Sequence, residues 1–188
     1  LLREPEALAD YRVVVARYGR FQTERALEAA LQRRVEFQLA DAQGAVLASV
    51  PHFSAAFPAF QGVDEPRALL LAEGPLRQQL VLAAQTLGRA SQPSFSAKGS
   101  ELEQALTSGD ADGVLAALLT QTGSPRKFGD KVVGIEQVRA VPVQLLDVLA
   151  AQAQHEAWDY QQRMTRLTRL LVDEFAALKR ERGWVDMN

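Results

Sequence analysis

Residues 160–178 read Tyr160-Gln-Gln-Arg-Met164-Thr-Arg-Leu167-Thr-Arg-Leu-Leu171-Val-Asp-Glu-Phe175-Ala-Ala-Leu178. The numbered apolar residues recur in steps of four or three, the spacing of a single face of an α-helix. We find no helix breaker between Pro142 and Arg182. The pattern therefore predicts one terminal helix of roughly 40 residues, about 60 Å long at the usual rise per residue.

The rest of the chain also favours helices, because it is rich in alanine, leucine, glutamine, glutamate and arginine. Its 188 residues are enough for about one domain with a buried core. We predict an all-α protein, an irregular helical bundle with one long C-terminal helix, forming a single domain over residues 1–188.

Proline and glycine divide the first half of the chain into segments. Pro5 suits a first helical turn, and Gly19 suits the end of a helix over residues 5–18. A longer helix is expected over 21–42, with Gly44 just beyond it. Two prolines and a glycine among aromatic residues in 45–65 predict a packed loop with short turns.

Further local signals place the middle elements. Pro75 predicts the start of a helix that ends near Gly88. Residues 91–99 are expected to form a loop, and Ser100 with Glu103 matches a capping box at the next helix start. Asp110 or Asp112 is expected to cap a short helix reaching about Thr120, before a break at 123–125.

The composition leaves little room for catalysis or metal binding within these residues. The chain has no cysteine, only two histidines, and no glycine-rich phosphate loop with its lysine. We therefore assign it no catalytic, cofactor-binding or metal-binding residue. No apolar run approaches the roughly 20 residues that span a bilayer, and no signal peptide opens the chain.

The net charge of −2 argues against a dedicated nucleic-acid-binding module, so any DNA contact must come from local basic clusters. One cluster follows Pro125 and contains Arg126, Lys127, Lys131 and Arg139, and the only acidic residues in this stretch are Asp130 and Glu136. Such cations bind phosphates without reading sequence. The alternative is that they solvate a loop.

Arg166 and Arg169 form a second basic set, on the helix face roughly opposite the apolar stripe. They are candidate DNA contacts, and the alternative is a solvated helix face. Trp158 and Trp184 are candidate platforms for stacking bases. The alternative places Trp158 in the core and Trp184 at a junction with another domain.

Two motifs resemble the UvrD/RecB/AddA family of superfamily 1 DNA helicases. The first is the end of the chain, where Phe175, Leu178 and Lys179 match an aromatic-x-x-Leu-Lys helix that stops at glycine. Gly183-Trp-Val-Asp186-Met187 then resembles the family's Gly-hydrophobic-hydrophobic-Asp-Phe return to its ATPase core, with methionine in place of phenylalanine. The second is the Leu-Thr-x-x-Gly-x-Pro-Arg-Lys run over 119–127, and the two occur in the family's order.

The resemblance implies that the chain is a piece of a longer helicase, the helical 1B insertion of the first core domain, which lies over the DNA. It implies weak, non-specific contact with the DNA backbone and packing against the remaining helicase domains, with no membrane partner. The parent protein would be an ATP-dependent DNA helicase/exonuclease of recombination and double-strand-break repair in the bacterial cytoplasm. ATP and Mg²⁺ would bind to the parent's other domains.

Two other interpretations remain open. The chain is alternatively a helical scaffold or protein-interaction module without nucleic-acid binding, which its near-neutral charge favours. A third possibility is a helical regulatory domain that binds a small ligand.

Overall fold

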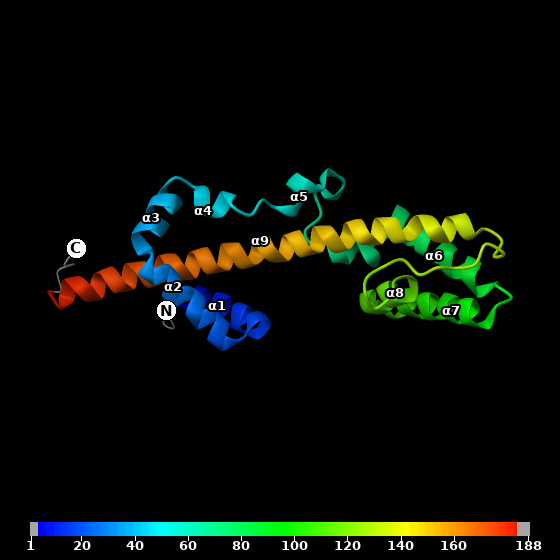
Figure 1. Cartoon of the computed structure of the whole chain (residues 1–188), viewed down its shortest axis with the longest axis horizontal. Coiled ribbons are helices and arrows are strands. Elements are labelled where there is room, and N and C mark those ends of the chain that lie inside the picture. The colour runs from blue at the N-terminus through cyan, green and yellow to red at the C-terminus, as the bar shows by residue number, and fades with distance from the viewer. Residues whose placement is uncertain (1–3, 184–188) are drawn as a thin grey trace. The chain divides into compact units, whose positions relative to one another are not determined.

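The computed structural model describes residues 4–183, and these residues form an all-α protein, as predicted (Figure 1). Their only β-type pairing is an isolated bridge between Leu119 and Pro125. The α-helices are α1 (Pro5–Tyr18), α2 (Arg20–Gln32), α3 (Arg34–Ala42), α4 (Ala45–Ala48), α5 (Phe53–Ala56), α6 (Pro75–Gly88), α7 (Pro93–Ser108), α8 (Ala111–Leu118) and α9 (Ile135–Glu181). Two short 3₁₀ helices are η1 (Pro58–Phe60) and η2 (Pro66–Leu70).

The chain divides into two compact units that share the longest helix. Unit 1 contains Leu1–His52 and Glu156–Asn188, and unit 2 contains Phe53–His155. The first part of α9 therefore belongs to unit 2 and the later part to unit 1. The single domain expected over residues 1–188 stays a prediction.

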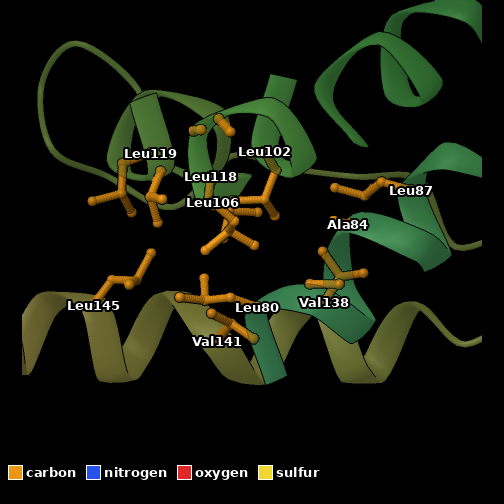
Figure 2. Close-up of a cluster of buried hydrophobic side chains, with 14 of the residues drawn as sticks. Leu80, Ala84, Leu87, Leu102, Leu106, Leu118, Leu119, Val138, Val141 and Leu145 are labelled. Carbon is orange, nitrogen blue, oxygen red and sulfur yellow. The ribbon is translucent and has the colours of Figure 1, made fainter. Parts of the chain in front are cut away.

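Unit 2 is built around an apolar core between α6, α7, α8 and the beginning of α9. Figure 2 shows Val138, Val141 and Leu145 of α9 pointing toward Leu80 of α6 and Leu106 of α7. Each of these five side chains is at most 5% exposed. The α9 residues are spaced three and four apart, so one helical face is buried along its whole contact with the unit.

A close approach of two backbones fixes the packing of α6 on α7. A Cβ atom on Gly99 of α7 would lie 2.3 Å from the backbone nitrogen of Gly88 and 2.8 Å from the carbonyl oxygen of Ala84. No side chain fits at that distance, so this crossing requires glycine.

Unit 1 has a smaller apolar core, formed by α1, α2 and the later part of α9. Its buried side chains are Val14, Leu27, Met164 and Leu167, with Leu171 packed at the edge. The predicted stripe of α9 is thus buried at Met164 and Leu167, whereas Leu178 is 44% exposed.

The helix expected over 21–42 is interrupted. Arg33, with φ −104° and ψ 32°, separates α2 from α3. Leu27 is buried, but Val35 and Leu39, which continue the same apolar spacing, are 57% and 63% exposed. The helix is interrupted at Arg33 although no proline or glycine lies there. As a result, the apolar side chains Val35 and Leu39 of α3 are exposed.

The loop expected over 91–99 is also wrong, because α7 begins at Pro93. Proline loses nothing in a first turn, where its missing N–H would have had no helical partner. Ser100 consequently lies inside α7, and the predicted capping box does not form. The structure confirms the helices predicted over 5–18 and 75–88. It also confirms the predicted cap of α8, because Asp110 Oδ1 accepts a hydrogen bond from Gly113 N at 3.0 Å.

The terminal helix begins earlier than predicted, at Ile135, and Pro142 lies inside it. Ile135 follows Gly134, which has a φ of 81°. Ile135, Val138 and Val141 bury the same face, so tertiary packing carries the helix through the proline. The residues of the Gly-Trp-Val-Asp-Met motif from Trp184 onward lie outside the described residues, and so does the Trp184 prediction.

Candidate nucleic-acid interface

The turn after α8 is held by its own backbone. Thr120 N donates to Ser124 O at 2.8 Å, and Gly123 N donates to Thr120 O at 2.9 Å. Gly123 has a φ of 76°, a conformation that favours glycine. Arg126 N then donates to Leu118 O at 2.9 Å, so the chain leaves the turn in a fixed direction.

Arg126 is partly committed to this turn. Its Nε donates to Ala116 O at 3.1 Å, which satisfies a carbonyl near the end of α8. The predicted contact residue therefore also caps a helix, and only its terminal guanidinium nitrogens remain for a ligand.

Lys127 and Lys131 are the exposed cations of the loop between α8 and α9. Neither ammonium group makes a hydrogen bond or ion pair with any residue of the range 4–183. Phe128, between them, is only 7% exposed and packs edge-on against Phe95 of α7, with ring centroids 5.3 Å apart. The buried ring anchors the loop, so both lysines are held at the surface of unit 2.

Arg139 has a different role. It forms ion pairs with Asp130 and with Glu136, the latter at 3.0 Å, and donates to Phe128 O at 3.3 Å. The hydrogen bond to Asp130 is the main reason that the pKa of Arg139 is raised. The positive charge of Arg139 is therefore compensated by two carboxylates. Its contacts with Asp130 and Phe128 O join the loop to α9.

A groove of about 870 Å³ with both polar and apolar lining residues lies beside this loop, within unit 2. Arg89 and Lys131 supply its cations, and Asp130, its carboxylate, pairs with Arg139. Arg89 makes no side-chain hydrogen bond or ion pair to the described part of the chain. The groove is further lined by uncharged hydrogen-bonding side chains, namely Gln85, Thr86, Ser91, Gln92 and Gln137.

Arg89 was not predicted from the sequence. It follows Gly88 at the end of α6, and α7 begins four residues later at Pro93. A cation in a short connection between two helices is a signal that could have identified Arg89. The signal was missed because a longer loop, over 91–99, was predicted there. The structure places it with Lys131, which is 42 positions away in the chain.

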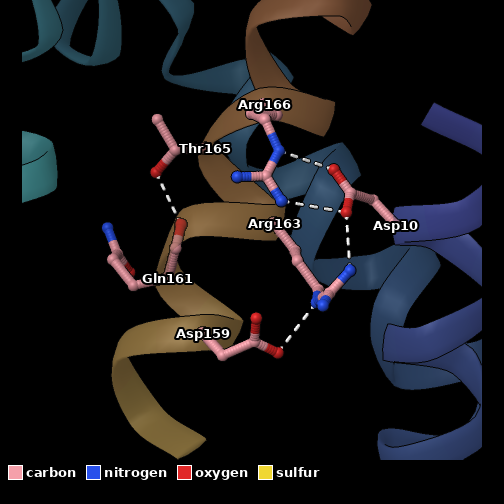
Figure 3. Close-up of polar contacts among 6 residues, drawn as sticks. All are labelled: Asp10, Asp159, Gln161, Arg163, Thr165 and Arg166. Carbon is pink, nitrogen blue, oxygen red and sulfur yellow. Dashed lines mark hydrogen bonds and ion pairs between the residues drawn. The ribbon is translucent and has the colours of Figure 1, made fainter. Parts of the chain in front are cut away.

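Arg166 and Arg169 lie in unit 1 and are both engaged by carboxylates. Arg166 donates two hydrogen bonds to Asp10 of α1, at 2.7 and 2.9 Å (Figure 3). Arg169 donates two to Asp41 of α3, both at 2.7 Å. These hydrogen bonds, from Arg166 and Arg169 respectively, lower the pKa values of Asp10 and Asp41.

A third arginine completes the Asp10 cluster. Arg163 donates to Asp10 Oδ1 at 2.8 Å and to Asp159 Oδ2, also at 2.8 Å (Figure 3). Asp10 is 6% exposed, so it is a buried carboxylate held between two guanidinium groups. The cluster fixes α1 on α9, and we regard Arg166 and Arg169 as structural ties rather than free cations.

The structure thus brings Arg126, Lys127, Lys131 and Arg139 together on one loop and the first turns of α9. It brings Arg166 and Arg169 together on another stretch of α9. Within residues 4–183 no cluster of histidine, aspartate or glutamate side chains is arranged to hold a metal ion. None of the described helices is long and apolar enough to cross a membrane.

Comparison with known proteins adds no relative. No protein-family model, no curated protein and no solved structure matches this chain.

Proposed function

We propose that this chain is a DNA-contacting accessory domain of an ATP-dependent DNA helicase/exonuclease of recombination and double-strand-break repair. The observation that carries the proposal is the set of exposed cations on unit 2. Lys127 and Lys131 make no ion pair to the described residues, and the Phe128 anchor holds both at the surface. Phosphate groups are the ligand that such unpaired cations suit best.

The sequence motifs support the same assignment. Lys127 ends the Leu-Thr-x-x-Gly-x-Pro-Arg-Lys run that resembles the UvrD/RecB/AddA helicases. In this chain the run forms a tight turn, and Arg126 is hydrogen-bonded to the end of α8 through Leu118 O and Ala116 O. Lys127 is the next residue and is exposed. The role is positional, because contacts to the DNA backbone fix orientation without reading sequence. ATP, Mg²⁺ and the motor itself belong in this proposal to the remainder of the parent protein.

The groove beside the loop extends the contact surface. Arg89 adds a third unpaired cation, and the glutamine side chains around it donate and accept hydrogen bonds. Three such cations predict few phosphate contacts and therefore weak, sequence-independent binding, in the non-specific range of roughly 10⁻⁴–10⁻⁶ M.

The experiment is a low-salt fluorescence-anisotropy titration with duplex, tailed-duplex and single-stranded oligonucleotides. The Lys127→Glu/Lys131→Glu variant should bind all of them more weakly, and the slope of log affinity against log salt on duplex should fall by about 1.8. An Arg12→Glu/Arg33→Glu variant is the matched control, since it changes the net charge equally by altering two exposed arginines of unit 1.

The control variant should keep most of the affinity and nearly the full salt slope. Equal losses in the two variants would mean that overall charge, and not this loop, determines binding. No binding by the unmodified chain at low salt would contradict the proposal itself.

A further inference from the structure

Unit 1 carries a second groove, which is apolar at its base. It has a volume of about 1060 Å³ and lies between α1, α2 and the later part of α9. Its base is formed by aliphatic side chains from all three helices, namely Val15, Leu27, Leu31, Leu170 and Leu171.

Part of this base lies outside the core of the unit. Leu27 is buried in it and Leu171 packs against it, but Leu31 and Leu170 belong to neither set and are partly exposed. Leu27 and Leu31 are four residues apart on α2, so they present two successive turns of one helix face. These side chains form a continuous apolar surface on which an added helix could pack. Burying this leucine surface would be favourable.

The rim of the groove is acidic. Glu4, Glu28 and Glu174 are exposed, and none of them forms an ion pair or side-chain hydrogen bond with another described residue. The fourth rim carboxylate, Glu24, accepts from Arg20 Nε at 2.7 Å and from the Tyr11 hydroxyl at 3.1 Å. Arg20 is the one cation among the described lining residues, so three carboxylates stay uncompensated.

We infer that this groove binds a basic amphipathic α-helix of another polypeptide. A helix laid between α2 and α9 places its apolar face on the leucines and completes a helix-in-groove interface. Lysine and arginine side chains at its edges bury their aliphatic stems and reach the rim glutamates with their charged ends. The same glutamates repel the phosphates of nucleic acid, so this surface is distinct from the DNA-contacting loop and does not rest on it.

The probe is a synthetic leucine–lysine helix of about 18 residues, or five turns, with leucine on one face and lysine on the other. A leucine–glutamate peptide of the same pattern is its control. We expect the leucine–lysine peptide to bind the 188-residue chain and the leucine–glutamate peptide to bind on the order of tenfold more weakly or not at all.

Two variants test the location. Glu28→Arg/Glu174→Arg reverses the rim and should weaken binding of the leucine–lysine peptide on the order of tenfold. Leu31→Gln alters the base and should also weaken it, while circular dichroism shows an unchanged helical fold, because Leu31 is outside the core cluster. Glu36→Arg/Asp173→Arg is the matched control in the same unit, with the same change of net charge and neither residue in the groove.

Retained affinity in Glu36→Arg/Asp173→Arg with loss in the two groove variants supports the inference. Equal affinity in all variants, or no binding to the unmodified chain, overturns it. Sedimentation that reveals a dimer dissociated by Glu28→Arg/Glu174→Arg would overturn it in favour of a second copy as occupant. DNA affinity should not fall in the groove variants, which separates this test from that of the DNA-contacting role.

Discussion

The two units hold α9 by different kinds of interaction. Among residues 4–183, the buried apolar cluster of unit 2 contains eighteen residues, whereas that of unit 1 contains four. Unit 1 instead ties α9 to its other helices through the ion pairs of Arg163 and Arg166 with Asp10 and of Arg169 with Asp41. Burial therefore dominates one unit, and directional charge-assisted hydrogen bonds supplement it in the other.

The two units should therefore be destabilised by different kinds of change. Apolar packing depends on filled volume, so unit 2 should respond to truncation of buried side chains. Charge-assisted bonds depend on protonation, so unit 1 should respond to acid and to neutral replacements of its carboxylates.

The largest effect is expected from the core of unit 2. Leu118→Ala removes a side chain that is 0% exposed between α8 and its neighbours, and should lower the free energy of unfolding by about 2–5 kcal/mol. Urea unfolding followed by circular dichroism measures the change. Val143→Ala, at a position of α9 that is 61% exposed, is the control and should cost less than about 0.5 kcal/mol. Similar losses in both would show that burial in the core of unit 2 does not determine the cost of truncation.

An intermediate effect is expected from the Asp10 cluster. Asp10→Asn keeps the shape of the side chain but leaves two guanidinium groups facing a neutral amide, and should cost about 1–3 kcal/mol. Asp41→Asn removes one partner of a pair whose arginine is 43% exposed, and should cost at most about 1 kcal/mol. Urea midpoints of both variants test this order, and a silent Asp10→Asn would show that the cluster contributes nothing to unit 1.

The smallest effect is expected from acid, which acts on the ion pairs of unit 1. The pKa values of Asp10 and Asp41 are lowered in the folded chain, chiefly by hydrogen bonds from Arg166 and Arg169. Their contribution is present above the unfolded value of about 4, and is lost as the pH falls through the lower folded values. Urea midpoints at about pH 7 and about pH 3 should therefore differ less in Asp10→Asn than in the unmodified chain. An equal or greater acid shift in that variant would contradict the assignment.

Local sequence signals predicted some elements well because their causes are local. Pro5 with Gly19 bounds α1, Pro75 opens α6, and Asp110 caps α8. The break at Arg33 and the start of α9 before Pro142 were missed. Both depend on which helix faces pack against other helices in the folded chain. The residues next to a boundary do not indicate this tertiary packing.

For the candidate site, too, local features could be predicted and contacts between distant residues could not. The exposure of Lys127 and Lys131 could be expected because lysines beside a Gly-Ser-Pro turn are a local feature, whereas their contact with DNA stays a prediction. Arg166 and Arg169 were equally visible as a basic helix face, but their partners lie 156 and 128 positions away. A single sequence does not pair such distant charges, so their structural role emerges only from the fold.

The distance between Asp10 and Arg166 along the chain also sets an order of events during synthesis. Helices α6, α7 and α8 are neighbours in sequence and meet soon after they leave the ribosome, whereas α1 lacks its partner until residue 166 has been made, 156 positions later. At 5–20 residues per second that delay is on the order of ten to thirty seconds. During this delay the side chains of α1 and α2 that pack on Met164 and Leu167 lack these partners. Helices α1 and α2 are thus translated before α6, α7 and α8 but complete their packing after them.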